Sequence, residues 1–166
     1  TIEKYGVPAE KIEVVYNGHL QSLGAASIVY GSSKLFHLTP ILFPILAAYL
    51  FFQLIYFYDR YHDLDIDYET NRVRTEHLLS YVKFMPLVFA VFFTLLAFIL
   101  LKTAHAHGII FTLVILIFGF LYPIFFKKIT QKIFLFKNFY VSSVFAIMTV
   151  YGNLYLDIPI ESLYFL

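Results

Sequence analysis

The amino-acid sequence predicts an all-helical membrane protein, a polytopic bundle of about five transmembrane helices. Hydrophobic residues make up 60% of the chain and charged residues only 14%, whereas a soluble domain has roughly 25% charged residues. The apolar residues are gathered in long stretches, and several of these approach the ~20 residues that a helix needs to cross a bilayer. Charged residues lie between the stretches, as expected for loops outside the hydrocarbon region.

Five apolar stretches are expected to span the membrane. The first, 18–38, is the weakest because it contains a lysine and several glycines and serines, small residues that suit close packing between membrane helices. The second, 41–58, has prolines near its start, where a helix tolerates them. The last three carry no charged residue and cover 84–101, 108–126 and 139–156.

The basic residues of the loops predict the orientation of the bundle. They are concentrated in the loop after the second span and in the loop after the fourth: Arg60, Arg72, Arg74 and Lys83, then Lys127, Lys128, Lys132 and Lys137. By the positive-inside rule these loops and the N-terminus are cytoplasmic. We therefore expect an integral protein of the cell membrane. The net charge of +1 and the lack of a basic tract give no indication of nucleic-acid binding.

Residues 1–18 differ in composition from the transmembrane domain, 19–166, and are expected to form a polar N-terminal extension. A β-branched run at 12–15 followed by Asn17 and Gly18 predicts a short strand and a turn. The segment resembles a short piece of the GT-B glycosyltransferases, but no donor-binding motif follows it. Because so short a segment cannot bury a core, we expect a solvated tail or a junction of two reading frames.

The most informative polar segment follows the second span. Asp59, Asp63 and Asp67 recur every four residues, so on a helix their carboxylates line one face at intervals of about 6 Å. Because stacked like charges repel, this spacing indicates a compensating cation, and Mg²⁺ is commonly held by carboxylates together with phosphate oxygens. We expect these aspartates to be metal ligands. A diphosphate on that metal would also need cationic partners, for which the candidates are Arg72, Arg74, Lys127 and Lys128.

Residues 59–74 resemble the first aspartate-rich motif of the UbiA-type intramembrane prenyltransferases. Asp63 and Asp67 match the last two aspartates of that motif, Asp59 stands where asparagine is usual, and Arg60 replaces an aspartate. The motif is specific, whereas the rest of the resemblance, over residues 19–156, is loose.

Other residues of the resemblance have supporting roles. Asn71 and Arg74 follow the aspartates as in divergent members of the superfamily, and Tyr122 lies where members carry similar residues. The resemblance implies a bundle of about nine spans when complete. It also implies an enzyme that binds a polyprenyl diphosphate through Mg²⁺ and transfers the prenyl group to an acceptor. Members have a second aspartate-rich motif that this chain lacks, so we expect the chain to be the first part of such a protein.

Two other classes of protein also use spaced carboxylates at a membrane face. One is a non-catalytic integral membrane protein whose acidic helix end binds a cation or a basic partner. The other, a phosphatidyl-alcohol transferase, also uses spaced aspartates. Its motif requires glycines near them, and no glycine lies between Gly31 and Gly108.

Overall fold

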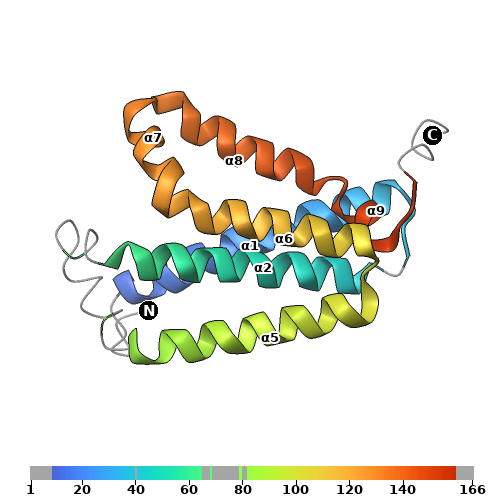
Figure 1. Ribbon diagram of the computed structural model, residues 1–166, viewed down its shortest axis with the longest axis horizontal. Coiled ribbons are helices and arrows are strands. Elements are labelled where there is room, and N and C mark those ends of the chain that lie inside the picture. Colours follow the sequence, from blue (N-terminus) through green and yellow to red (C-terminus); the bar gives the residue numbers. More distant parts are fainter. Residues whose placement is uncertain (1–8, 40, 65–67, 69–78, 80–81, 160–166) are drawn as a thin grey trace.

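A computed structural model of the chain describes residues 9–39, 41–64, 68, 79 and 82–159. Every element within these residues is a helix, which confirms the predicted all-helical class (Figure 1). The elements are α1 (Ala9–Leu35), α2 (Leu42–His62), the 3₁₀ turn η2 (Val82–Phe84), α5 (Met85–Thr103), α6 (Ala106–Leu121), the π-helical turn η3 (Tyr122–Phe126), α7 (Lys127–Lys132), α8 (Phe134–Met148) and α9 (Tyr151–Leu156).

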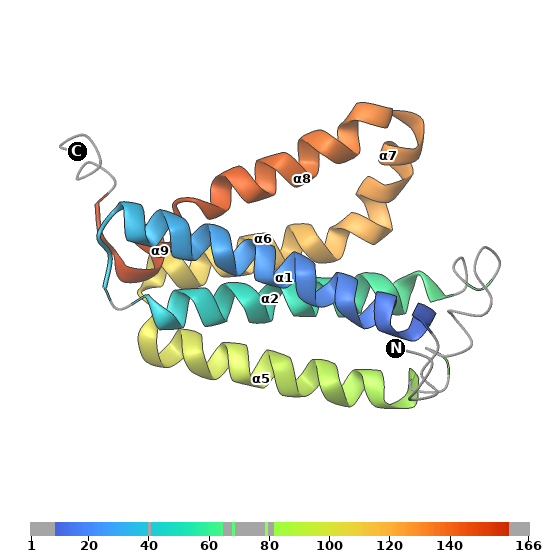
Figure 2. The same ribbon diagram turned by 180° about the vertical axis from the view of Figure 1, so that it is seen from behind.

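The long helices run back and forth along the bundle, so its two ends gather residues that are far apart in the sequence (Figures 1 and 2). Helix α2 is central and packs against α1, α5 and α6. We call the end at which α2 finishes and α7 begins the acidic end, because it carries Asp63. The opposite end, at which α9 lies, we call the tyrosine end, because it carries Tyr151 and Tyr155.

Within the described residues, three helical segments are long and apolar enough to cross a membrane: Leu42–His62, Val82–Thr103 and Ala106–Ile129. They correspond to the second, third and fourth predicted spans. Each is a continuous apolar helix of at least the length that a bilayer requires. The structure therefore supports a membrane protein by the length and composition of its helices.

The first predicted span belongs to a longer helix than the sequence suggests. Helix α1 begins at Ala9 and continues through Asn17 and Gly18, where the sequence predicts a strand and a turn. The predicted boundary between residues 18 and 19 therefore lies inside a helix. Local propensities for strand and turn are worth about 1 kcal/mol or less per residue, so the packing of α1 against α2 can override them.

The fifth predicted span, 139–156, is two helices rather than one. Helix α8 ends at Met148, and α9 begins at Tyr151. Between them the Thr149 N–H donates to the Ala146 carbonyl and the Val150 N–H to the Ile147 carbonyl, both at 3.2 Å. These bonds reach back three residues and make a tight turn that apolar composition alone does not reveal.

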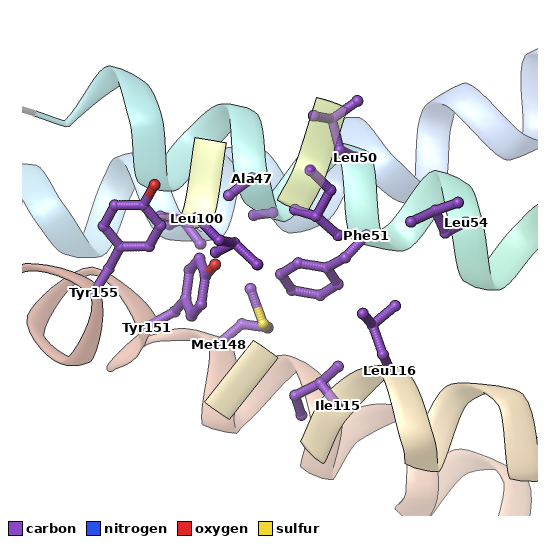
Figure 3. Close-up of a cluster of buried hydrophobic side chains, with 13 residues drawn as sticks. Ala47, Leu50, Phe51, Leu54, Leu100, Ile115, Leu116, Met148, Tyr151 and Tyr155 are labelled. Atoms are coloured by element: carbon purple, nitrogen blue, oxygen red, sulfur yellow. The ribbon is translucent and has the colours of Figure 1, made fainter. Parts of the chain in front are cut away.

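The buried core lies where α2, α5, α6 and α9 meet. Phe51 of α2 packs edge-on against Tyr151 of α9, with ring centroids 5.5 Å apart, and Leu100 of α5 joins them (Figure 3). The hydroxyl of Tyr151 lies 2.8 Å from the Thr112 Oγ1. Because Thr112 donates its own hydrogen to the Gly108 carbonyl, the tyrosine is the donor in this pair. The core thus fixes the tyrosine end and orients α2 and α6, whose other ends form the acidic end.

Candidate functional site at the acidic end

Two of the three predicted metal ligands lie at the end of α2: Asp59 is on its last turn and Asp63 caps it. The helix continues to His62, four residues beyond the predicted span, and the backbone N–H of Asp63 donates to the Asp59 carbonyl at 3.0 Å. A bond from residue i to i−4 means that the two aspartates are one helical turn apart, as the spacing predicts. The third predicted ligand, Asp67, lies outside the described residues.

Asp63 forms an ion pair with Lys127, which lies 64 positions further along the chain. The Lys127 ammonium donates to the Asp63 Oδ2, and the Asp63 side chain is only 8% exposed. The structure thus joins one predicted metal ligand to one predicted diphosphate-binding residue. Lys128, also predicted to bind the diphosphate, is exposed. Tyr122, predicted as a supporting residue, stacks on Tyr140 with ring centroids 5.1 Å apart. The other predicted residues lie outside the described part of the chain: Asn71, Arg72 and Arg74.

A π-helical turn at the end of α6 sets the direction of Lys127. In η3 the backbone N–H of Lys127 donates to the Tyr122 carbonyl, five residues back instead of four. Pro123 has no N–H and interrupts the α-helical ladder at this point. The extra residue turns every later side chain by about 100° relative to a regular helix. The Tyr122-Pro123 pair was the visible signal for this turn, but the sequence does not reveal the new direction.

Within the described part of the chain, the second carboxylate oxygen of Asp63 lacks the hydrogen-bond partner that the first one has. Its Oδ1 is buried and makes no hydrogen bond among the described residues, and it lies 3.8 Å from the His62 Nδ1. A buried carboxylate needs a counter-charge or hydrogen bonds to offset its desolvation. Lys127 supplies one charge at Oδ2, and Oδ1 remains an acceptor of the kind that a hard cation binds.

The described residues supply part of a metal site. No group of three or more histidine, aspartate or glutamate side chains comes together within the described part of the chain. Asp59 and Asp63 provide two carboxylates there. The donor chemistry and the orphaned Asp63 oxygen fit Mg²⁺, which is commonly held by one or two carboxylates with substrate phosphates completing its shell.

An aromatic cluster fixes the backbone next to Lys127. The Phe126 ring lies 5.5 Å from the Tyr140 ring and 6.1 Å from the Phe136 ring of α8. The Tyr140 hydroxyl also donates to the Phe118 carbonyl of α6 at 3.0 Å. These contacts tie α8 to η3 and hold the turn that carries Lys127. Aromatic residues are so frequent in this chain that the sequence did not distinguish this cluster.

A polar network lies within the apolar part of α2, and the sequence analysis did not identify it. The Gln53 amide lies 2.9 Å from the His19 Nδ1 and 3.2 Å from the Tyr49 hydroxyl, and these last two atoms lie 2.6 Å apart. Gln53 is 2% exposed. A glutamine in the middle of an otherwise apolar span was the available signal. The network joins α1 to α2.

The fold and the acidic end define a class of protein: a bundle of helices apolar enough to cross a membrane, with a part-buried aspartate–lysine pair at one end. No family model, curated protein or solved structure matches the chain. The particular function is therefore argued from the residues of the acidic end.

Proposed function

We propose that the chain acts as a UbiA-type prenyltransferase that binds a polyprenyl diphosphate through Mg²⁺ at the acidic end. The observation that carries the proposal is the ion pair between Asp63 and Lys127. Carboxylates for a metal and an ammonium for phosphate oxygens meet beside helices apolar enough to surround a prenyl chain. By the positive-inside rule, we propose that the acidic end faces the cytoplasm.

The roles of the residues follow from their chemistry. Asp59 and Asp63, with Asp67, would hold the metal, and Lys127 and Lys128, with Arg72 and Arg74, would bind the phosphate oxygens. Mg²⁺ at this position would supply neutralisation of the charge that develops on a diphosphate leaving group. The apolar helices keep the prenyl chain out of water, and the acceptor would approach from the same end.

Binding of a defined ligand tests this proposal. The full chain is placed in lipid nanodiscs, and the binding of radiolabelled geranylgeranyl diphosphate is measured with and without Mg²⁺. We expect binding that requires Mg²⁺ and that falls at least about tenfold in Asp63→Asn, because one carboxylate charge is lost. Asp157→Asn is the matched control, since Asp157 lies at the tyrosine end and pairs with His107.

Two results would contradict the proposal. The first is binding of geranylgeranyl diphosphate that does not depend on Mg²⁺. The second is an equal loss of binding in Asp63→Asn and Asp157→Asn, which would mean that the acidic end has no special part in it.

The same ion pair favours one other function, a non-catalytic membrane protein in which the acidic end binds a basic group for structural reasons. In that case the ammonium of Lys127 is itself the bound cation, and the pair ties α2 to the start of α7. The double variant Asp63→Lys, Lys127→Asp separates the two functions. It keeps an ion pair, so the structural function predicts wild-type thermal stability, whereas each single variant is less stable. If the protein is a prenyltransferase, the double variant should lose Mg²⁺-dependent binding of the diphosphate.

A further inference from the structure

We propose that Tyr140 is a positioning residue for the acidic end, because from α8 it holds the π-helical turn that directs Lys127 to Asp63. The inference rests on the proposed function in one respect, since it assigns Tyr140 to the site that binds the diphosphate. It goes beyond that function because Tyr140 acts through Lys127 and lies on a helix that carries none of the predicted site residues.

A π-helical turn needs support from the rest of the fold. Its hydrogen bonds reach back five residues instead of four, and such turns are rare and occur mostly singly inside α-helices. Pro123 removes one donor from the α-helical ladder. The missing bond weakens the regular register but does not choose the direction of the residues that follow. Side-chain contacts with a neighbouring helix therefore decide where Lys127 points.

Tyr140 contacts the whole length of this turn. It comes from α8, which runs back along the bundle after α7 (Figures 1 and 2). Its ring lies 5.1 Å from the ring of Tyr122, the first residue of η3, and 5.5 Å from the ring of Phe126, the last. Its hydroxyl donates to the Phe118 carbonyl at 3.0 Å, one helical turn before η3. One side chain thus holds residues 118, 122 and 126 together.

The contact with Phe126 leads directly to the ion pair. Phe126 immediately precedes Lys127, and Tyr122 accepts the backbone hydrogen bond of Lys127. Because successive side chains of a helix lie about 100° apart, a ring held at Phe126 also fixes the direction of Lys127. The Asp63 side chain is only 8% exposed, so the ammonium has to approach it from a narrow range of directions. A rotation of the turn therefore separates Lys127 from Asp63.

Chemical labelling of lysines reports the direction of Lys127. The full chain in lipid nanodiscs is acetylated as wild type and as Tyr140→Leu, and the rate at each lysine is measured by mass spectrometry. We expect Tyr140→Leu to raise the rate at Lys127 several-fold, because the ammonium leaves the part-buried pair and gains exposure to water. The rate at Lys128 should not change, because Lys128 is already exposed.

Phe145→Leu is the matched control. Phe145 also lies on α8, but its ring stacks on Phe52 of α2, with centroids 5.8 Å apart. The variant removes an aromatic contact of the same helix at a ring that packs on α2 instead of η3. It should leave the acetylation of Lys127 as in the wild type.

Binding of the diphosphate separates a positioning role from a merely structural one. Mg²⁺-dependent binding of geranylgeranyl diphosphate is measured in Tyr140→Leu, in Lys127→Met and in the double variant. We expect Tyr140→Leu to weaken binding about fivefold in the chain that has Lys127 and to have little further effect where Lys127 is replaced. A general loss of structure would instead weaken binding by the same factor in both backgrounds.

A conservative variant keeps the test decisive if Tyr140→Leu does not fold. Tyr140→Phe retains both ring contacts and loses only the hydrogen bond to the Phe118 carbonyl. Its labelling of Lys127 and its binding of the diphosphate should lie between those of the wild type and of Tyr140→Leu.

The inference is overturned if neither variant of Tyr140 changes the labelling of Lys127, if Phe145→Leu changes it as much, or if Tyr140→Leu weakens binding equally with and without Lys127. Its failure is distinct from that of the proposed function. Mg²⁺-dependent binding of geranylgeranyl diphosphate with unchanged labelling would remove the positioning role alone. The expected labelling without any binding of the diphosphate would remove the prenyltransferase and leave Tyr140 as the residue that directs Lys127.

Discussion

Replacing Gly108 with alanine should destabilise the bundle, because this glycine lies directly against the backbone of α9. A Cβ at Gly108 would lie 2.6 Å from the Tyr155 Cα, 3.2 Å from the Leu154 carbonyl oxygen and 3.3 Å from the Tyr155 N. Carbon atoms in favourable contact are about 3.5–4.0 Å apart, so the overlap is roughly 1 Å. The atoms that the methyl group meets are main-chain atoms, which cannot rotate away. Helix α9 itself has to move.

That movement strains two bonds at the tyrosine end. The His105 N–H donates to the Tyr155 carbonyl at 3.0 Å, and the Tyr155 hydroxyl lies 2.5 Å from the Thr103 Oγ1. Overpacking of this kind costs about 1–3 kcal/mol, and a weakened hydrogen bond adds up to about 1 kcal/mol. Alanine returns less than about 1 kcal/mol through its higher helix propensity. The net loss in the free energy of unfolding should be about 2 kcal/mol.

Thermal unfolding in detergent, followed by far-ultraviolet circular dichroism, measures the effect. A loss of about 2 kcal/mol in a chain of 166 residues corresponds to a Tm lower by about 4–8 °C. Gly24→Ala is the matched control, because a Cβ at Gly24 in α1 meets nothing within 4 Å, and it should leave the Tm unchanged or raise it. A Tm for Gly108→Ala equal to that of the wild type would refute the close approach of α6 and α9.

Two further predictions concern buried polar groups. Asn153 is 1% exposed and both of its side-chain polar atoms lack a hydrogen-bond partner among the described residues, so Asn153→Leu should raise the free energy of unfolding by about 1–2 kcal/mol. The same unfolding assay checks it, and a lower Tm would show that the amide is satisfied. Thr112→Val should cost about 1–3 kcal/mol, because it leaves the buried Tyr151 hydroxyl without its acceptor at 2.8 Å. Adding Tyr151→Phe to that variant should recover most of the loss, and no recovery would contradict the assigned bond.

The elements that the sequence predicts well are those whose signal is apolar length. The segments Leu42–His62, Val82–Thr103 and Ala106–Ile129 are apolar helices with the length of a membrane span, and the predicted spans fall on them. Each contains a long stretch without charge, and these stretches are the predicted spans 41–58, 84–101 and 108–126. A helix of this kind satisfies its own backbone groups, so its existence depends little on the rest of the fold.

The ends and breaks of helices were harder to predict because contacts with distant residues decide them. The turn between α8 and α9 lets Gly152 approach α1 so closely that a Cβ there would lie 2.5 Å from the Ser33 Oγ. That contact joins residues 119 positions apart in the chain. The sequence marks the break only weakly, with Thr149 before it and Gly152 and Asn153 after it, so the tertiary packing adds what these local signals lack.

The acidic end combines a predictable part with an unpredictable one. The spacing of Asp59 and Asp63 places them one turn apart on any helix, and the basic loops place Lys127 on the same side of the membrane. Whether Lys127 reaches Asp63 depends on its direction around the axis of α6. The π-helical turn at Pro123 changes that direction by about 100°, which is enough to move a side chain from one face of a helix to the next. The ion pair therefore depends on the register of the backbone. Composition and residue spacing, the two signals that a single sequence offers, do not predict it.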